Sequence, residues 1–79
     1  MQREALERLK WRSRRGLLEL DIVLERFWAR EGERLTEREA RALEQLLLLP
    51  DNDLLDLVMG RAHPPAGDPG DLVKKLKAA

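Results

Sequence analysis

The chain has 79 residues, which is the length of one small domain, and it contains no cysteine. The lack of cysteine excludes a disulfide framework, a thiolate metal site and a cysteine nucleophile. The formal net charge is zero although 38% of the residues are charged, so no overall field favours nucleic acid or acidic lipid. We expect a single helical domain over residues 1–79.

The pattern of hydropathy argues against a membrane segment. The longest apolar run, "LLLL" at 46–49, is far too short to cross a bilayer. The N-terminus is charged from Arg3 onward and lacks an apolar export region. We therefore expect a cytoplasmic protein without membrane insertion.

Two helices are predicted in the first half of the chain. Residues 3–15 are rich in helix formers and carry a local charge of +4, with Trp11 off the apolar stripe. The stretch 17–35 predicts the better helix, with its end near Gly32. Phe27 is expected to anchor the core. The apolar residues of this helix follow the i, i+3, i+4, i+7, i+8 spacing of an amphipathic helix: Leu20, Val23, Leu24, Phe27 and Trp28.

Helix signals continue in the second half. Thr36 followed by Glu39 has the spacing of a capping box, and Pro50 stops the helix that this box begins. A short fourth helix follows, capped by Asp51 or Asn52 and ended by Gly60. After a loop rich in proline and glycine, Asp68 as N-cap and Pro69 as first residue open a last helix. No strand pattern is long enough to compete, so the expected fold is all-α, a small antiparallel bundle of about five short helices.

The residues that could perform catalysis are few. His63 is the only histidine, it precedes two prolines in the loop, and no second ligand lies at metal-binding spacing. Ser13 is the only serine, and Thr36, the only threonine, is used as a cap. No glycine-rich phosphate loop is present. We expect no enzyme activity, no catalytic residue and no metal site.

The stretch "SRRGLLELD", residues 13–21, needs a separate explanation. Gly16 interrupts a helical pattern, at a cost of about 1 kcal/mol relative to alanine within a helix. A tight corner at Gly16, with positive φ or a close backbone approach, would make the glycine necessary. Arg15 and Glu19 would then emerge side by side from the bend. A structural reading is equally open, in which Gly16 ends one helix and Glu19 complements the dipole of the next.

The stretch "RRGLLELDIVLERF" resembles the signature of the small assembly factors that promote covalent flavin attachment to the flavoprotein subunit of succinate dehydrogenase. The family pattern is Arg-Gly-x-x-Glu followed by a leucine and an acidic residue. The resemblance continues in the Leu-Thr cap and in an acidic turn near residue 51. The matching residues are Arg15, Gly16, Glu19, Leu20, Asp21, Leu35, Thr36, Asp51, Asn52, Asp53 and Leu54.

The resemblance implies a non-catalytic chaperone with five helices. Its partner would be the flavoprotein subunit of succinate dehydrogenase, with fumarate reductase as a second candidate client. A histidine of the partner would attack the flavin, so this chain would carry no cofactor of its own and act on FAD attachment in its partner, as a monomer when free. The implied partner-binding residues are Arg14, Arg15, Gly16, Glu19 and Asp21.

Two other functions remain open at this point. An antitoxin-like or nucleic-acid-binding regulator is suggested by the basic first helix, which could contact phosphates. The zero net charge and the acidic residues Asp51, Asp53 and Asp56 argue against it. The chain could also be a purely structural helical module.

Overall fold

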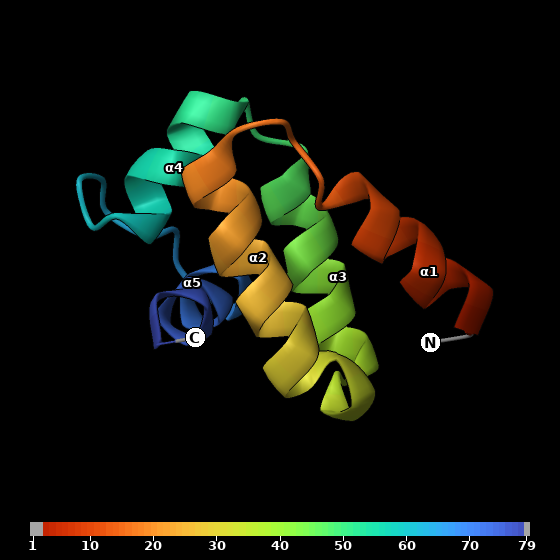
Figure 1. Ribbon diagram of the computed structural model, residues 1–79. Helices are drawn as coiled ribbons and strands as arrows, with labels where there is room; N and C mark the ends of the chain where they lie inside the picture. Colours follow the sequence, from red (N-terminus) through yellow and green to blue (C-terminus); the bar gives the residue numbers. More distant parts are fainter. Residues whose placement is uncertain (1–2, 79) are drawn as a thin grey trace.

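The computed structural model describes residues 3–78 and contains five α-helices and one short 3-10 turn (Figure 1). No strand occurs in this range, which confirms the all-α prediction. The end of the last predicted helix, Ala79, lies outside the described residues. The elements are α1 (Arg3–Arg12), α2 (Leu18–Glu31), η1 (Gly32–Arg34), α3 (Glu37–Leu47), α4 (Asp51–Val58) and α5 (Asp68–Ala78).

The core lies between α2, α3, α4 and α5. Helices α2 and α3 run antiparallel and are joined through η1, while α5 is seen nearly end-on in Figure 1 and crosses both. Helix α5 contacts α2, α3 and α4. Phe27 is fully buried, which confirms its predicted role as a core residue. The other fully or almost fully buried large side chains are Leu20, Leu24, Leu43, Leu46, Leu54, Leu72, Val73 and Leu76.

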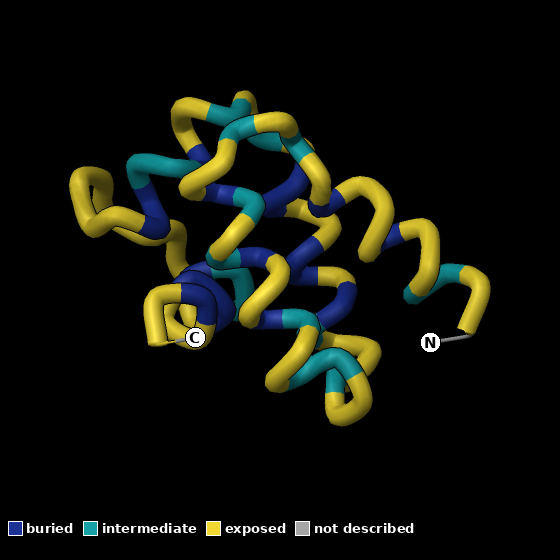
Figure 2. The backbone as a smooth tube through the Cα atoms, in the orientation of Figure 1, coloured by how far each residue is buried: buried dark blue, intermediate teal, exposed yellow. Residues whose placement is uncertain are grey.

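Helix α1 lies at the edge of this core and contributes one buried side chain to it. It packs against α3, and Leu9 is its buried residue, with Leu6 partly buried beside the core. Figure 2 shows most of α1 as exposed. Trp11 is 70% exposed, as its position off the apolar stripe predicted. Most of the α1 surface is therefore available to solvent.

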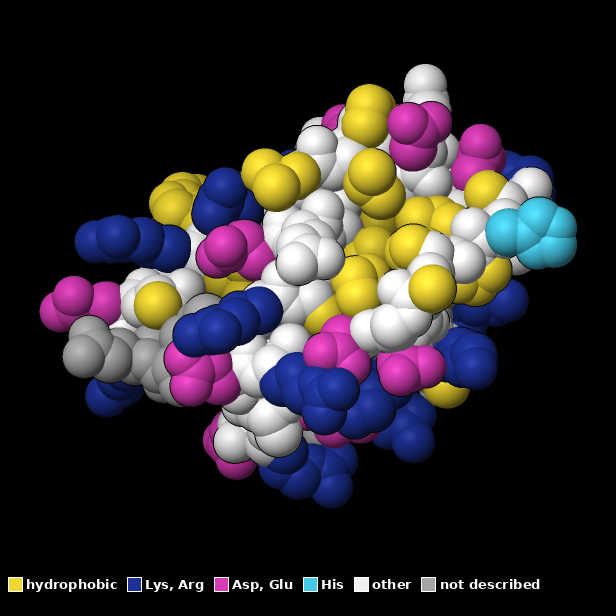
Figure 3. Space-filling view, turned by 180° about the vertical axis from the view of Figure 1, so that it is seen from behind, with side chains coloured by type: hydrophobic (Ala, Val, Ile, Leu, Met, Phe, Trp, Pro, Cys, Tyr) yellow, Lys and Arg dark blue, Asp and Glu magenta, His cyan; other side chains and the backbone are white. Residues whose placement is uncertain are grey.

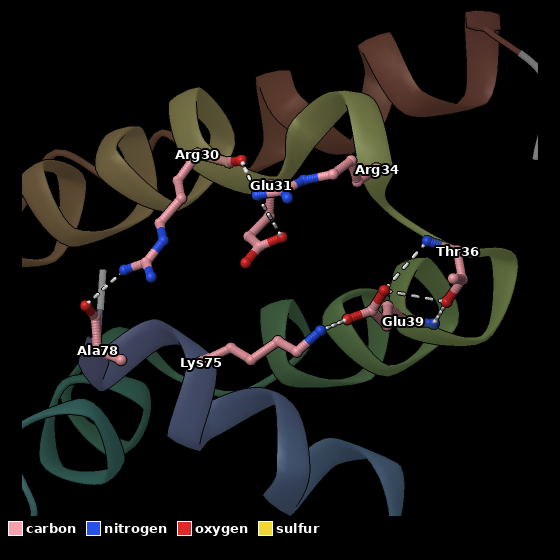
Figure 4. Close-up of polar contacts among 7 residues, drawn as sticks. All are labelled: Arg30, Glu31, Arg34, Thr36, Glu39, Lys75 and Ala78. Atoms are coloured by element: carbon pink, nitrogen blue, oxygen red, sulfur yellow. Dashed lines mark hydrogen bonds and ion pairs between the residues drawn. The ribbon is translucent and has the colours of Figure 1, made fainter.

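The predicted capping box at the start of α3 is confirmed. The backbone N–H of Glu39 donates to Thr36 Oγ1 at 3.1 Å, and the backbone N–H of Thr36 donates to Glu39 Oε1 at 3.2 Å. The second oxygen of the same carboxylate accepts a hydrogen bond from Lys75 Nζ in α5 (Figure 4). One carboxylate thus closes the start of α3 and links it to α5.

The predicted cap of α4 is wrong. Pro50 is the N-cap residue, no side chain caps the helix, and Asp51 is the first helical residue. The Pro50 carbonyl accepts the first helical hydrogen bond, from the N–H of Leu54 at 3.1 Å. Asp51 instead pairs with Arg15, a residue far away in the sequence.

The start of α5 differs from the prediction by one residue. The helix begins at Asp68, so Pro69 is its second residue and Asp68 is not the N-cap. The carbonyl of Gly67 accepts the first helical hydrogen bond, from Asp71 at 3.1 Å. The Asp68 carboxylate pairs with Arg38 at 2.6 Å, which leaves it engaged with a different helix.

The predicted end of α4 is confirmed, because Met59 is the C-cap and Gly60 follows with φ of +79°. Among residues 3–78, no helix combines the length and the apolar character that crossing a bilayer requires.

Candidate functional site

Residues 13–17 form a tight corner between α1 and α2. Gly16 has φ of +83° and is exposed, which confirms the predicted bend. Residues with a side chain avoid this left-handed region because their Cβ approaches the following carbonyl oxygen. Apart from Gly16 itself and its two chain neighbours, no residue has an atom within 4 Å of the place that a Cβ on Gly16 would occupy. The backbone angle alone therefore requires glycine in the free protein, and the space above the corner is open.

Asp21 holds the corner in shape from the first turns of α2. Its Oδ1 accepts a hydrogen bond from the backbone N–H of Arg15 at 2.8 Å, and its Oδ2 accepts one from Gly16 at 3.2 Å. Hydrogen bonds to an ionised carboxylate are stronger than those between neutral groups. Asp21 is half-buried and satisfies two backbone donors that no helix uses.

Arg15 turns inward from the same corner. Its Nη2 donates to the carbonyl oxygen of Leu47, the last residue of α3, at 2.6 Å and to that of Leu49, just before α4, at 2.9 Å. These carbonyls lie at the end of a helix and have no helical donor. Nε lies 3.0 Å from Asp51 Oδ1, close enough for an ion pair but off the axis of a hydrogen bond. The guanidinium thus joins the α1–α2 corner to the α3–α4 junction.

The expectation that Arg15 and Glu19 emerge side by side is therefore wrong for the free chain. The Arg15 side chain is only 18% exposed because it is drawn to free carbonyls and to Asp51. Glu19 lies in the first turn of α2 and is exposed. Only the carboxylate of this pair projects freely into solvent.

Two apolar side chains accompany Glu19 on the surface. Leu18 is 74% exposed and Ile22 is 37% exposed. Residues three and four apart are neighbours on a helix surface, so Ile22 adjoins both Leu18 and Glu19. We call Gly16, Leu18, Glu19 and Ile22 the corner patch. The corner patch combines a backbone bend with free space beside it, one carboxylate and two exposed apolar side chains.

The side chain of Arg14 lies against Trp11 of α1. It is exposed, and its guanidinium carbon lies 5.6 Å from the centre of the Trp11 ring, within the range of a cation–π contact. The five residues predicted as a site thus divide by role: Gly16, Glu19 and Arg14 are exposed, whereas Arg15 and Asp21 bind other parts of the chain.

Ser13 is a structural residue that the sequence did not reveal. Its hydroxyl donates to the Leu9 carbonyl at 3.0 Å and accepts from Trp28 Nε1 at 2.9 Å. It is buried, and it ties the end of α1 to α2. A serine in a helix can bond the carbonyl four residues earlier, but the contact with Trp28 depends on tertiary packing.

The remaining chemistry is sparse. His63 projects from the exposed loop before α5 (Figure 3), and no group of potential metal ligands occurs within residues 3–78. The hydrogen bond from Lys75 holds the pKa of Glu39 below its usual range, and the same contact raises the pKa of Lys75. These shifts arise in an ion pair between α3 and α5, away from the corner patch.

Comparison with known proteins identifies the relatives of this chain. The sequence profile of the Sdh5 family, described as flavinator of succinate dehydrogenase, matches residues 7–79. The chain belongs to this family. The matched range contains the whole corner and all five helices except the first residues of α1.

Individual members of the flavinator family support the assignment. The chain is 54% identical over 57 residues to the FAD assembly factor SdhE of Ralstonia nicotianae, covering 72% of this chain and 60% of that protein. It is 37% identical over 73 residues to the FAD assembly factor SdhE of Coxiella burnetii, covering 92% and 89%. A third relative, the FAD assembly factor SdhE of Legionella pneumophila, is 44% identical over 81% of each chain. No solved structure matches the chain.

Proposed function

We propose that this chain is an assembly chaperone that binds the flavoprotein subunit of succinate dehydrogenase and promotes covalent attachment of FAD to it. Membership of the flavinator family supports this function, as do the names of the relatives. The chain contributes binding and positioning, while the partner holds the flavin and performs the covalent chemistry. It acts as a monomer without a cofactor of its own, and fumarate reductase is a second client.

The contact surface in this proposal is the corner patch, with Arg14 at its edge. The observation that supports it best is that Gly16 and Glu19 are exposed while Asp21 and Arg15 fix the backbone beneath them. A surface that is already ordered loses little conformational entropy when it binds. Arg15 and Asp21 are therefore positioning residues in the free chain, and the partner meets Gly16, Leu18, Glu19 and Ile22.

The test is co-expression of the flavoprotein subunit with this chain. Covalent flavin is read as fluorescence of the subunit in a denaturing gel, since free FAD is lost there. We expect fluorescence with the wild-type chain and a large decrease without it. Equal fluorescence in both samples would show that the chain does not assist flavin attachment.

The site is tested separately with Glu19→Ala. Glu44 is also an exposed carboxylate, on α3, so Glu44→Ala is the matched control. We expect Glu19→Ala to lower both subunit binding and covalent flavin, while its melting temperature and the control remain near wild type. If both variants support full flavin attachment, the corner patch is not the contact surface.

A further inference from the structure

Helix α1 and Arg14 carry cations that the rest of the chain does not neutralise. Five cations face two anions, Glu4 and Glu7, which gives this segment a charge of +3 within a neutral chain. In the part of the chain that the structure describes, none of the five forms an ion pair, although α2 to α5 contain several. The five are Arg3, Arg8, Lys10, Arg12 and Arg14.

An exposed aromatic ring lies among these cations. Trp11 is 70% exposed, and Arg14 stacks over it at 5.6 Å. A hollow of about 390 Å³ is lined by Trp11, Arg14, Arg8, Lys10 and Glu7. Tryptophan and arginine are among the residues that are enriched where the binding energy of protein interfaces is concentrated. Stacking also orders both side chains before any partner arrives, which lowers the entropic cost of binding.

We infer that the α1 face, formed by Arg8, Lys10, Trp11 and Arg14, docks an acidic segment of the flavoprotein subunit. This inference rests on the proposed function and adds a second contact area to the corner patch. Carboxylates of the segment face Arg8, Lys10 and Arg14, and an apolar side chain of the segment packs on the Trp11 ring. Arg14 precedes Gly16 by two residues, so the chain that carries the α1 face leads directly into the corner.

A protein segment fits the α1 face better than nucleic acid does. Glu7 lines the same hollow as Trp11, and Glu4 lies nearly one turn earlier on α1. A phosphate backbone would be repelled by both carboxylates. A protein segment can place a lysine, an arginine or a backbone N–H beside Glu7 and its own carboxylates beside the cations.

The inference is tested by measuring the affinity of the purified flavoprotein subunit for full-length variants. The variants are Trp11→Ala, Trp11→Phe and the double change Arg8→Glu with Lys10→Glu. Lys74→Glu on α5 is the control for charge, and Met59→Ala at the end of α4 is the control for exposed apolar surface. Both controls alter exposed residues away from α1, and circular dichroism confirms that each variant is folded.

We expect Trp11→Ala and the double charge change each to weaken binding by about tenfold or more. Trp11→Phe recovers most of the affinity because it restores an aromatic surface, and both controls bind like wild type. Wild-type affinity also falls as salt rises from about 0.05 to about 0.3 M, and the double variant shows a weaker salt dependence.

Other outcomes overturn the inference in distinguishable ways. If the wild type binds the subunit and the Trp11 and charge variants bind equally well, the α1 face is not a contact and the proposed function stands. If the wild type does not bind the subunit, the proposed function fails and this inference fails with it. If the wild type binds a DNA duplex and Trp11→Ala abolishes that binding, the α1 face serves nucleic acid instead.

Discussion

The guanidinium of Arg15 donates a hydrogen bond of 2.6 Å to the carbonyl oxygen of Leu47, a residue 32 positions later in the chain. The bond connects the corner that carries the proposed contact surface to the end of α3. The same guanidinium forms a second hydrogen bond, to the Leu49 carbonyl, and an ion pair with Asp51, so three contacts join these two regions. The shape of the corner therefore depends on the second half of the fold.

Arg15→Ala is expected to destabilise the free chain by about 2–3 kcal/mol, because it leaves two helix-end carbonyls without their charged donor. Arg15→Lys keeps the charge but cannot reach both carbonyls and Asp51 together, so we expect it to lose less stability than Arg15→Ala but to be less stable than wild type. Urea unfolding followed by circular dichroism measures both. An Arg15→Ala variant as stable as wild type would show that these contacts contribute nothing to folding.

Gly16→Ala is expected to cost about 1 kcal/mol, since φ is +83° and the penalty comes from the backbone and not from crowding. Gly16→Asn costs less, because asparagine tolerates this region better. Gly16→Arg has a stability similar to Gly16→Ala but projects bulk and charge from the corner, so it abolishes subunit binding. The measurement pairs thermal melts with flavin fluorescence of the co-expressed subunit. A folded Gly16→Arg chain that still supports full flavin attachment would rule out the corner as the contact site.

The ion pair between Glu39 and Lys75 makes stability depend on pH. The pKa of Glu39 is lower in the folded chain than its usual value because Lys75 donates a hydrogen bond to it. The contribution of this ion pair to folding stability is therefore present at neutral pH, and it is lost as the pH falls through the pKa of Glu39 in the folded chain. Acidification from about pH 6 to about pH 3 should lower the melting temperature of wild type by a few degrees more than that of Glu39→Gln. A difference of this size corresponds to the loss of one surface ion pair. Equal decreases would show that this pair does not contribute.

Gly70→Ala is expected to destabilise the chain although alanine favours helices. A Cβ on Gly70 would lie 2.0 Å from the carbonyl oxygen of Pro65, so the loop before α5 would have to move away from the helix. We expect a net loss of about 1–3 kcal/mol, as for other overpacked sites. Lys74→Ala, an exposed change on the same helix, is the control and should remain within about 0.5 kcal/mol of wild type. Unfolding midpoints in urea compare the two variants with wild type.

The sequence predicted those features that depend on neighbouring residues. The capping box of Thr36 and Glu39 is a local pattern, and the burial of Phe27 follows from helical spacing. The inward turn of Arg15 could not be predicted, because its partners come from a distant helix end. Asp51 illustrates the same limit, since its sequence position suits a cap but its carboxylate pairs with Arg15.

The sign of φ at Gly16 also could not be predicted from the sequence. A glycine at a helix junction is equally compatible with a positive φ and with the close approach of another backbone. The structure shows the former, with open space where a side chain would stand. The roles of Arg14, Arg15, Gly16, Glu19 and Asp21 in binding a partner remain predictions, and the experiments above address them.

The contacts of Arg15 have a consequence for synthesis on the ribosome. The signature stretch is complete once residue 21 has been made, but Leu47, Leu49 and Asp51 must also emerge before Arg15 reaches its final position. A nascent chain that has left the exit tunnel only as far as α2 carries the signature without its final shape. The corner therefore takes its final shape only after residues up to Asp51 have emerged, when most of the fold has been produced.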